Sequence, residues 1–448
     1  MAICSKHVLA ACAGGIVGVG SVAAQVSEWT GPVSGDWLTA ANWSAGVPTG
    51  TARVLTGSPI LSGSTLFSSL ELAGGAQVSV GTGSNMTITG PMSTNNGLIR
   101  LNPNNSSFNS VLLFPNSTMF DGSGVIQLLT SGDNSQLTGA GMLINGENHT
   151  IRGTGRVAID FVNQGVIDGS LGNGGIATLE IRSGGENQGT MSATESAGTA
   201  GILEFVGVPI LQTGAGQLLA DGGQVQFESG TSITGGSIET TNSGFAVTTS
   251  GTTGFTNVTN NGDLFLNQGT FIAVTGSGFQ NNGVTTLNPQ NGSFNSIVRF
   301  DQTGALSGSG ELRLLTGNDN SQLTTAAGQT INHGGSHTVR GVGEIKAEMN
   351  NAGTIAADTS IALSGTDLAL QLNDKSNTGL LEARTGSLLN IESITIDQTG
   401  GGDIEANGGT VNFFGTSAVI GGDVSSSAGG AVGVRASSVT TFDNVDLD

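Results

Sequence analysis

The stretch "NNGLIRLNPNNSSFNS" at residues 95–110 returns further along the chain as "NNGVTTLNPQNGSFNS" at residues 281–296. A near-copy at so wide a separation is a tandem duplication, and a repeat has to be found before any fold is assigned. Other pairs keep almost the same separation: "LLTSGDNSQLT" (128–138) with "LLTGNDNSQLT" (314–324), "HTIRGTG" (149–155) with "HTVRGVG" (337–343), and "QTGAGQLLADGGQVQF" (212–227) with "QTGGGDIEANGGTVNF" (398–413).

The repeat extends upstream of these motifs. Residues 70–92 align without gaps on residues 256–278, and apolar positions match, as with Val78 on Leu264. We therefore expect two long repeats of about 186 residues each, one at 66–251 and the other at 252–438. Because "FDNVDLD" (442–448) resembles "FTNVTNN" (255–261), residues 439–448 are predicted to begin a third, truncated unit of a longer array.

A shorter rhythm runs inside each unit. Motifs of the form N-x-G or G-G precede a short alternating apolar stretch about every 20 residues, a spacing typical of solenoids. In "GGQVQF", Val225 and Phe227 face one side of a strand while Gln224 and Gln226 face the other. One strand cannot bury such a face alone, but stacked coils bury a continuous column. Asparagine and glycine supply the left-handed conformations of sharp corners, and stacked asparagines are expected to add side-chain ladders.

Composition supports short strands joined by tight turns. Glycine makes up 75 of 448 residues, only 10% are charged, and 36% are hydrophobic. Disorder would require more charge, and collagen would require glycine at every third position. No glycine-free window keeps a helical period, so helices are not expected. The sequence predicts an all-β protein, a right-handed parallel β-helix (β-solenoid), with the hand taken from the usual crossover preference.

Residues 1–24 are expected to be removed. Lys6 precedes a short apolar run that ends in a small-x-small cleavage pattern at Val22 and Ala24, which is typical of a secretory signal peptide. A membrane anchor and lipidation at "LAAC" (9–12) are the alternatives. Both cysteines, Cys4 and Cys12, lie in this segment, so the mature chain would have no disulfide. No later run is long enough for a membrane span.

The charge balance excludes two classes of partner. The formal net charge is −20. Nucleic acid and anionic membrane surfaces both require a basic face, so neither is an expected partner.

All three tryptophans, Trp29, Trp37 and Trp43, lie within residues 25–65, in front of the first unit. An open solenoid end exposes apolar surface and strand edges and needs a cover. We therefore interpret residues 25–65 as an N-terminal cap. The alternative is a glycan-binding platform in which sugars stack on the three indole rings.

The leader carries a resemblance. Its pattern W-x-G…GDW…A-NW…G-x-P resembles the segment that follows the signal peptide in secreted bacterial β-helix proteins with autotransporter-type β-strand repeats; it is carried by Trp29, Gly31, Gly35, Asp36, Trp37, Ala41, Asn42, Trp43, Gly46 and Pro48. The repeats resemble the same group over most of residues 50–448. That resemblance implies an exported rod on the cell surface. The C-terminal membrane barrel of true autotransporters is not recognised in this sequence.

Few residues have the pattern of a chemical site. His149 and His337 occupy equivalent positions of the two units, as do Arg152 and Arg340, and a catalytic site is seldom copied with its coil. A metal shared by His333 and His337 is an alternative without a supporting ligand pattern. The remaining candidates are Asp133-Asn134 and Asp319-Asn320 as calcium loops or solvated turns, and Asp160 and Asp168 as a carboxylate pair.

These observations predict an extracellular or cell-surface structural protein, adhesin-like and associated with the outer membrane. No catalytic residue, cofactor or metal is assigned. Expected partners are surface glycans or other matrix components, together with self-association at the solenoid ends. The copied units predict a uniform surface. The alternative function is a carbohydrate-binding or carbohydrate-cleaving β-helix.

Overall fold

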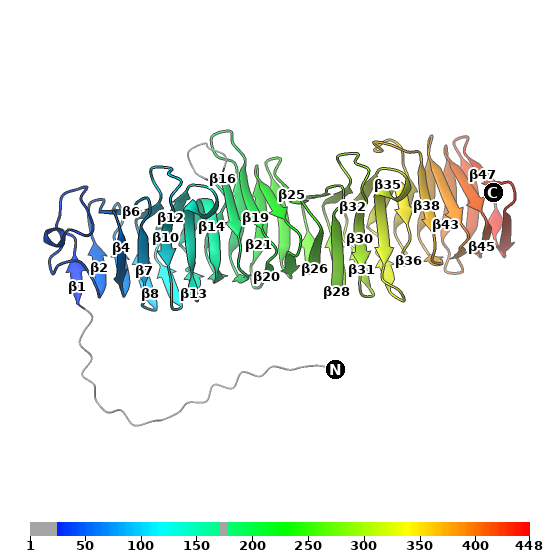
Figure 1. The fold of residues 1–448 in the computed structure, drawn as a ribbon. Coiled ribbons are helices and arrows are strands. Elements are labelled where there is room, and N and C mark those ends of the chain that lie inside the picture. Colours follow the sequence, from blue (N-terminus) through cyan, green and yellow to red (C-terminus); the bar gives the residue numbers. More distant parts are fainter. Residues whose placement is uncertain (1–24, 171–176) are drawn as a thin grey trace, which may run out of the picture.

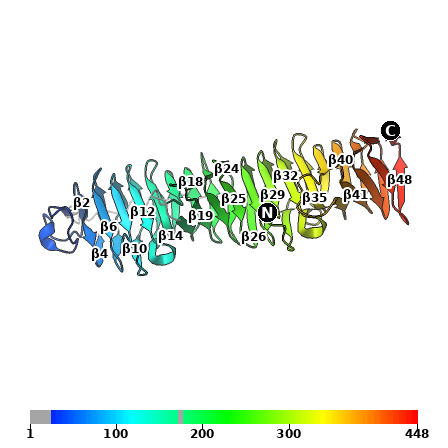
Figure 2. The same ribbon diagram turned by 90° about the horizontal axis from the view of Figure 1, so that it is seen from above.

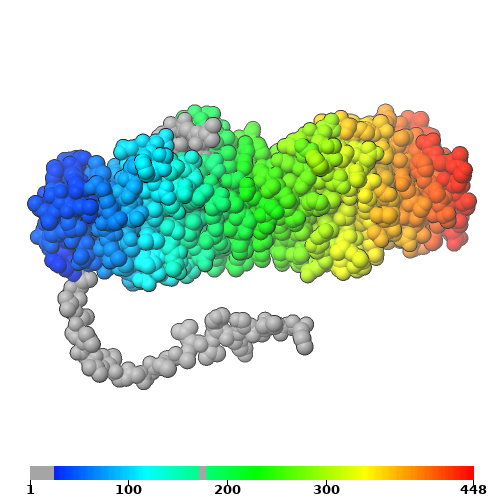
Figure 3. Space-filling view, viewed as in Figure 1, coloured from blue at the N-terminus to red at the C-terminus, as the bar shows by residue number. Residues whose placement is uncertain are grey.

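The computed structural model describes residues 25–170 and 177–448, so the predicted signal peptide lies outside the described residues. The described chain forms one long rod (Figures 1 and 3). Its 49 strands pair in parallel and wind into about 18 coils. In these residues the only helices are three single 3₁₀ turns, and none could cross a membrane. The predicted all-β solenoid is confirmed. Its hand stays a prediction.

Each coil contributes one strand to each of three columns, which we name by their first strands. The β1 column contains β1 (26–28), β2 (51–54), β5 (69–72), β8 (92–95), β11 (118–121), the second part of β13 (135–145), the last part of β14 (150–163), β17 (185–187), β20 (209–212), β23 (232–234), the start of β26 (252–260), the start of β28 (271–281), β30 (296–300), β33 (321–325), the end of β35 (338–345), β38 (367–371), β41 (388–392), β44 (410–414) and β47 (431–434).

The other two columns run beside the first along the rod (Figure 2). The β3 column contains β3 (60–61), β6 (77–80), β9 (98–101), β12 (125–129), the start of β14, β15 (166–168), β18 (190–194), β21 (217–221), β24 (237–241), the ends of β26 and β28, β31 (304–307), β34 (330–333), β36 (348–351), β39 (375–377), β42 (395–397), β45 (416–420) and β48 (439–443). The β4 column contains β4 (64–67), β7 (85–88), β10 (110–113), the start of β13, the middle of β14, β16 (177–181), β19 (201–205), β22 (224–227), β25 (245–248), β27 (263–266), β29 (284–287), β32 (311–315), the start of β35, β37 (354–357), β40 (380–384), β43 (403–407), β46 (423–427) and β49 (446–447).

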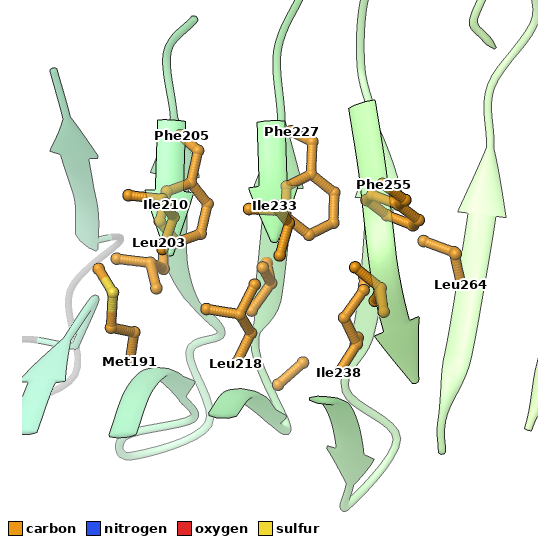
Figure 4. Packing of buried hydrophobic residues seen from close by; sticks show 14 of the residues in the cluster. Met191, Leu203, Phe205, Ile210, Leu218, Phe227, Ile233, Ile238, Phe255 and Leu264 are labelled. Atoms are coloured by element: carbon orange, nitrogen blue, oxygen red, sulfur yellow. The ribbon is translucent and has the colours of Figure 1, made fainter. Parts of the chain in front are cut away.

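The core follows from the alternation of side chains. In β22, Val225 and Phe227 are fully buried while the two glutamines stay partly exposed, as predicted. Parallel register places like residues on neighbouring rungs, so Phe227 stacks on Phe205 with ring centroids 5.8 Å apart. Figure 4 shows this column beside its aliphatic neighbours. A single hydrophobic core therefore runs the length of the rod.

The corners use the residues expected of them. Asn102 and Asn288, equivalent in the two units, have φ angles of 54° and 55°. Each buries its amide and ties down its own loop: Asn102 donates to Ser106 O at 2.7 Å and Asn288 donates to Gly292 O at 2.8 Å. The corner loops after β9 and β29 are thus copied with their internal hydrogen bonds.

The two units are not aligned on the rod. Ser110 begins β10 in the β4 column, whereas its equivalent, Ser296, begins β30 in the β1 column. Eight rungs of the β4 column lead from β10 to β29, and β30 is one column further. One unit therefore covers eight and one-third coils. Each residue of the second unit consequently lies one column further around the rod than its equivalent in the first unit.

The expected uniform surface is therefore wrong. Equivalent residues of the two units face directions one column apart, because the repeat is not a whole number of coils. Whatever the rod presents to a partner, it does not present the same stripe twice on one side.

Candidate functional sites

The tryptophan segment folds over the N-terminal end of the core. Trp43 lies between the other two rings, with centroid distances of 4.6 Å to Trp37 and 5.2 Å to Trp29. Trp37 also stacks on Phe67 of the first full coil at 5.5 Å. The indole N–H of Trp43 donates to Trp37 O at 2.7 Å and that of Trp29 to Pro32 O at 3.2 Å.

The smaller residues of the leader motif make this packing fit. A Cβ added to Gly31 would meet Asn42 and the Trp29 ring at 2.8 Å. Asn42 accepts backbone hydrogen bonds from Thr30 and Gly31 and donates through its amide to Asp36 O at 2.9 Å. The motif thus encodes one folded plug.

The three indole rings are 5%, 0% and 4% exposed for Trp29, Trp37 and Trp43. Sugar stacking requires a free ring face, and the structure places these faces inside the core cluster. Glycan binding by these tryptophans would require the segment to open. The rings pack as core residues at the N-terminal end of the rod, and the cap stays a prediction.

A buried polar chain, the first amide ladder, runs along the ends of strands in the β1 column. The His149 ring is hydrogen-bonded to Asn95 at 2.9 Å and to Asn145 at 2.7 Å. The Asn145 amide donates to Asn163 at 2.7 Å, and the Asn163 amide donates to Asn187 at 2.8 Å. All five side chains are fully buried. The expected asparagine ladder is confirmed, with a histidine inserted in it.

The second amide ladder repeats this arrangement one column further, at the ends of β3-column strands. Its members are Asn260, Asn281, His337, His333, Asn351, Asn377 and Gln398, joined in that order. At the positions that both ladders share, the one chemical difference is His333, which stands where the first ladder has Asn145. Asn260 and Gln398 extend the second ladder beyond those positions.

The ladder geometry assigns the histidines a neutral state. The amide oxygen of Asn95 accepts the Gly97 N–H, so its nitrogen donates to Nε2 of His149, and Nδ1–H of the imidazole donates onward. Burial lowers the pKa of His149 to about 4. Burial, with the neighbouring imidazole of His333, lowers the pKa of His337 to about 3. Burial also lowers the pKa of His333.

No sequence-proposed ligand set comes together. His333 and His337 hydrogen-bond directly at 2.9 Å, which leaves no room for a shared ion between those nitrogens. Asp133 and Asp319 lie in the 3₁₀ turns η2 (132–134) and η3 (318–320). Among residues 25–170 and 177–448, no group of three or more histidine, cysteine or acidic side chains could hold a metal ion.

The suggested carboxylate pair is also separated. Asp160 lies in the β1 column and Asp168 in the β3 column, so they occupy different sides of the rod. Asp168 is held by Ser170, by Ser192 Oγ at 3.1 Å and by the Thr194 N–H at 3.1 Å. Their short sequence spacing places the two acids on successive strands, not together.

Two charged groups on the β4 column stand out. Glu204 lies near Glu180 and Glu228; burial first, then these two carboxylates, raise its pKa to about 7. Asp358 accepts from Arg340 and Arg384, each at 2.9 Å. Although burial opposes it, these arginines and Ser360 lower the Asp358 pKa to about 2.

A buried lysine was missed by sequence reasoning. Lys375 occupies an inward rung between Met349 and Ile396, where burial lowers its pKa to about 7. Its ammonium donates to Asn373 O at 2.6 Å beside a surface pocket of about 590 Å³. Only the inward–outward alternation of "NDKSN" could have indicated it. In so short a strand the sequence does not show which residues point inward.

Part of the chain is similar to a known bacterial adhesin. The chain is 29% identical over 253 residues to the adhesin BmaC autotransporter of Brucella suis biovar 1 (strain 1330). The match spans 54% of this chain but only 7% of that protein's length. No family model matches the chain, and no solved structure matches it. The likeness supports the expected resemblance to adhesin and autotransporter proteins in its coarse form.

Proposed function

We propose that the chain is an exported, adhesin-like rod that holds binding surfaces away from the cell and catalyses no reaction. The observation that carries this is a single core continued through about 18 coils. At roughly 4.8 Å per coil, the rod is on the order of 85 Å long. Such a body is a spacer with a large lateral surface. The likeness to an adhesin autotransporter supports both the class and a cell-surface location.

The proposal is tested by attachment. Beads coated with residues 25–448 are expected to adhere to matrix-coated or glycan-coated surfaces more than beads coated with an unrelated acidic protein of equal charge. The same preparation is offered polysaccharides in a reducing-end assay, where no sugar release is expected. Release that disappears in Glu204→Gln would instead support a carbohydrate-cleaving enzyme, because a carboxyl whose pKa is raised to about 7 suits a general acid. Equal attachment of both bead types contradicts the adhesin proposal.

We also propose that the end opposite the cap associates with another coil. Strands β47, β48 and β49 each have one hydrogen-bonded neighbour among the described residues, and Val434, Val439 and Leu447 are 48%, 65% and 64% exposed. An unpaired strand edge with apolar side chains is a template for pairing. Either a second copy or a following coil of the same chain would bury it.

Residues 25–448 are expected to self-associate with rising concentration in sedimentation velocity. Val439→Lys should weaken this association because it puts a charge on the exposed edge. Val33→Lys, at a position 78% exposed within the cap, is the matched control and should change nothing. Association equally sensitive to both changes would place the contact elsewhere.

A further inference from the structure

A groove crosses the outer face of the β4 column where the first unit meets the second. Its floor is formed by β22, β25 and β27, and its cavity volume is about 340 Å³. Two aromatic rings lie in it: Phe245 and Phe265, with centroids 5.3 Å apart at an interplanar angle of 66°. Both are partly exposed, whereas Phe205 and Phe227 on the preceding rungs of this column point into the core.

The aromatic pair is not a product of the repeat. The gapless alignment of the two units places Ser79 opposite Phe265, and Ser79 is an ordinary serine of β6. Several residues that stabilise the coil are copied between units, such as His149 with His337 and Asn102 with Asn288. Phe265 has no aromatic counterpart in the first unit and points outward, so it is not needed to pack the core of the coil.

Apart from the Thr249 hydroxyl, the polar side chains of the groove are amides. Gln226 donates to Gln224 Oε1 at 2.9 Å, which orients both side chains on the floor. One wall is the corner loop that carries Pro289 and Gln290. That loop is rigid because the buried amide of Asn288 holds it with bonds of 2.8 Å to Gly292 O and 3.0 Å to Thr316 Oγ1. The glutamine pair on the floor and the loop that forms the wall are thus held in place.

None of the described residues that line the groove is charged, in a protein with net charge −20. Charged residues lie nearby on the same column: Asp263 begins the floor strand β27, Glu204 lies one rung before Gln226, and Arg313 lies one rung after Thr286. A charged ligand would find no counter-ion here. A ligand with apolar ring faces and neutral hydroxyl groups would find aromatic surface and amides together.

We propose that this groove, defined by Phe245, Phe265, Gln224, Gln226 and Pro289–Gln290, binds an uncharged glycan. One sugar ring packs its C–H face on Phe265 and Phe245, and its hydroxyl groups exchange hydrogen bonds with the two glutamines and Gln290. The inference rests on the proposed adhesin function and deepens it by giving it a ligand class. The site differs from the leader tryptophans, whose rings are buried.

The test uses residues 25–448 on an array of neutral, uronic-acid and sulfated oligosaccharides and extended peptides, followed by calorimetric titration of the best ligand. We expect neutral oligosaccharides to bind. Phe265→Ser installs the residue that the first unit has at this position and should weaken affinity about tenfold. Phe294→Ser, which removes a ring that is 67% exposed on the loop outside the groove, is the control and should have no effect. Gln226→Ala should weaken binding without removing an aromatic ring.

Binding that survives both Phe265→Ser and Gln226→Ala would overturn the proposal, as would binding only by charged glycans or peptides, or by none. Thermal unfolding of each variant verifies that the outward substitution leaves the rod folded. If wild-type beads adhere and Phe265→Ser beads adhere equally, the groove assignment fails while the adhesin proposal stands. If the groove binds glycan but beads do not adhere, the adhesin proposal fails alone.

Discussion

Replacing Trp37 with alanine is expected to unfold the first coils while leaving the rest of the rod intact. The side chain is fully buried and contacts Trp43 in the cap and Phe67 in β4. Truncating a buried tryptophan leaves a large cavity and costs about 3–5 kcal/mol. Because each coil contacts only its neighbours, the loss stays near the cap. Amide hydrogen exchange in β2, β4 and β5 should accelerate by about two to four orders of magnitude.

Two comparisons make this result specific to the cap. Leu66→Ala removes an apolar side chain of β4 that is 60% exposed and should leave exchange nearly unchanged. Amides of β43 and β44, far along the rod, should keep their protection in both variants. A Trp37→Ala protein that exchanges like Leu66→Ala in β2 to β5 would show that the leader does not stabilise the end of the solenoid. Trp37→Ala should also aggregate more readily than Leu66→Ala, because opening the first coils exposes the hydrophobic core.

The fold was predictable because its determinants are local and repeated. Alternation in "GGQVQF", turn residues at regular intervals and a long internal duplication each specify a strand, a corner or a stack. Stacked corner asparagines could also be expected. The cap could be proposed from three tryptophans outside the repeat, since an end needs a cover.

The sites were less predictable because they depend on which column each strand joins and on which side of the strand each residue points. Sequence gives the offset between units but not the number of strands it spans, so the one-column rotation of the second unit was not foreseen. Asp160 and Asp168 show the same difficulty on a smaller scale, since successive strands face different sides. The groove was missed because Phe245 and Phe265 resemble core residues until the strand register assigns them outward.

Acid is expected to destabilise the rod over a defined pH window through the ladder histidines. Their folded pKa values are lowered, to about 4 for His149 and about 3 for His337, while an unfolded histidine titrates near 6.5. Between these values the unfolded chain binds protons that the folded chain does not. The histidine contribution to stability is therefore constant above about pH 6.5 and falls as the pH drops toward 4. For His149 alone the loss is about 3 kcal/mol. Urea unfolding monitored at intervals from pH 7.5 to 4 measures it.

The two amide ladders supply their own matched substitutions for this prediction. His333→Asn gives the second ladder the residue that the first has at Asn145, which accepts from one neighbour and donates to the next, so the hydrogen-bonded chain is kept and one titrating group is removed. Asn145→His makes the reciprocal change. The first variant should lose less stability between pH 7 and 4 than the wild type, and the second should lose more, with both close to the wild type at pH 7.5. Carboxylates cannot mimic this pattern, because neither substitution alters one. Glu204, whose raised pKa of about 7 lies in the window, contributes equally to all three proteins, and Asp358 titrates near pH 2, below the window. Identical pH profiles for all three proteins would mean that the imidazoles do not control acid stability, and that the buried ladder is held by packing of the coils around it.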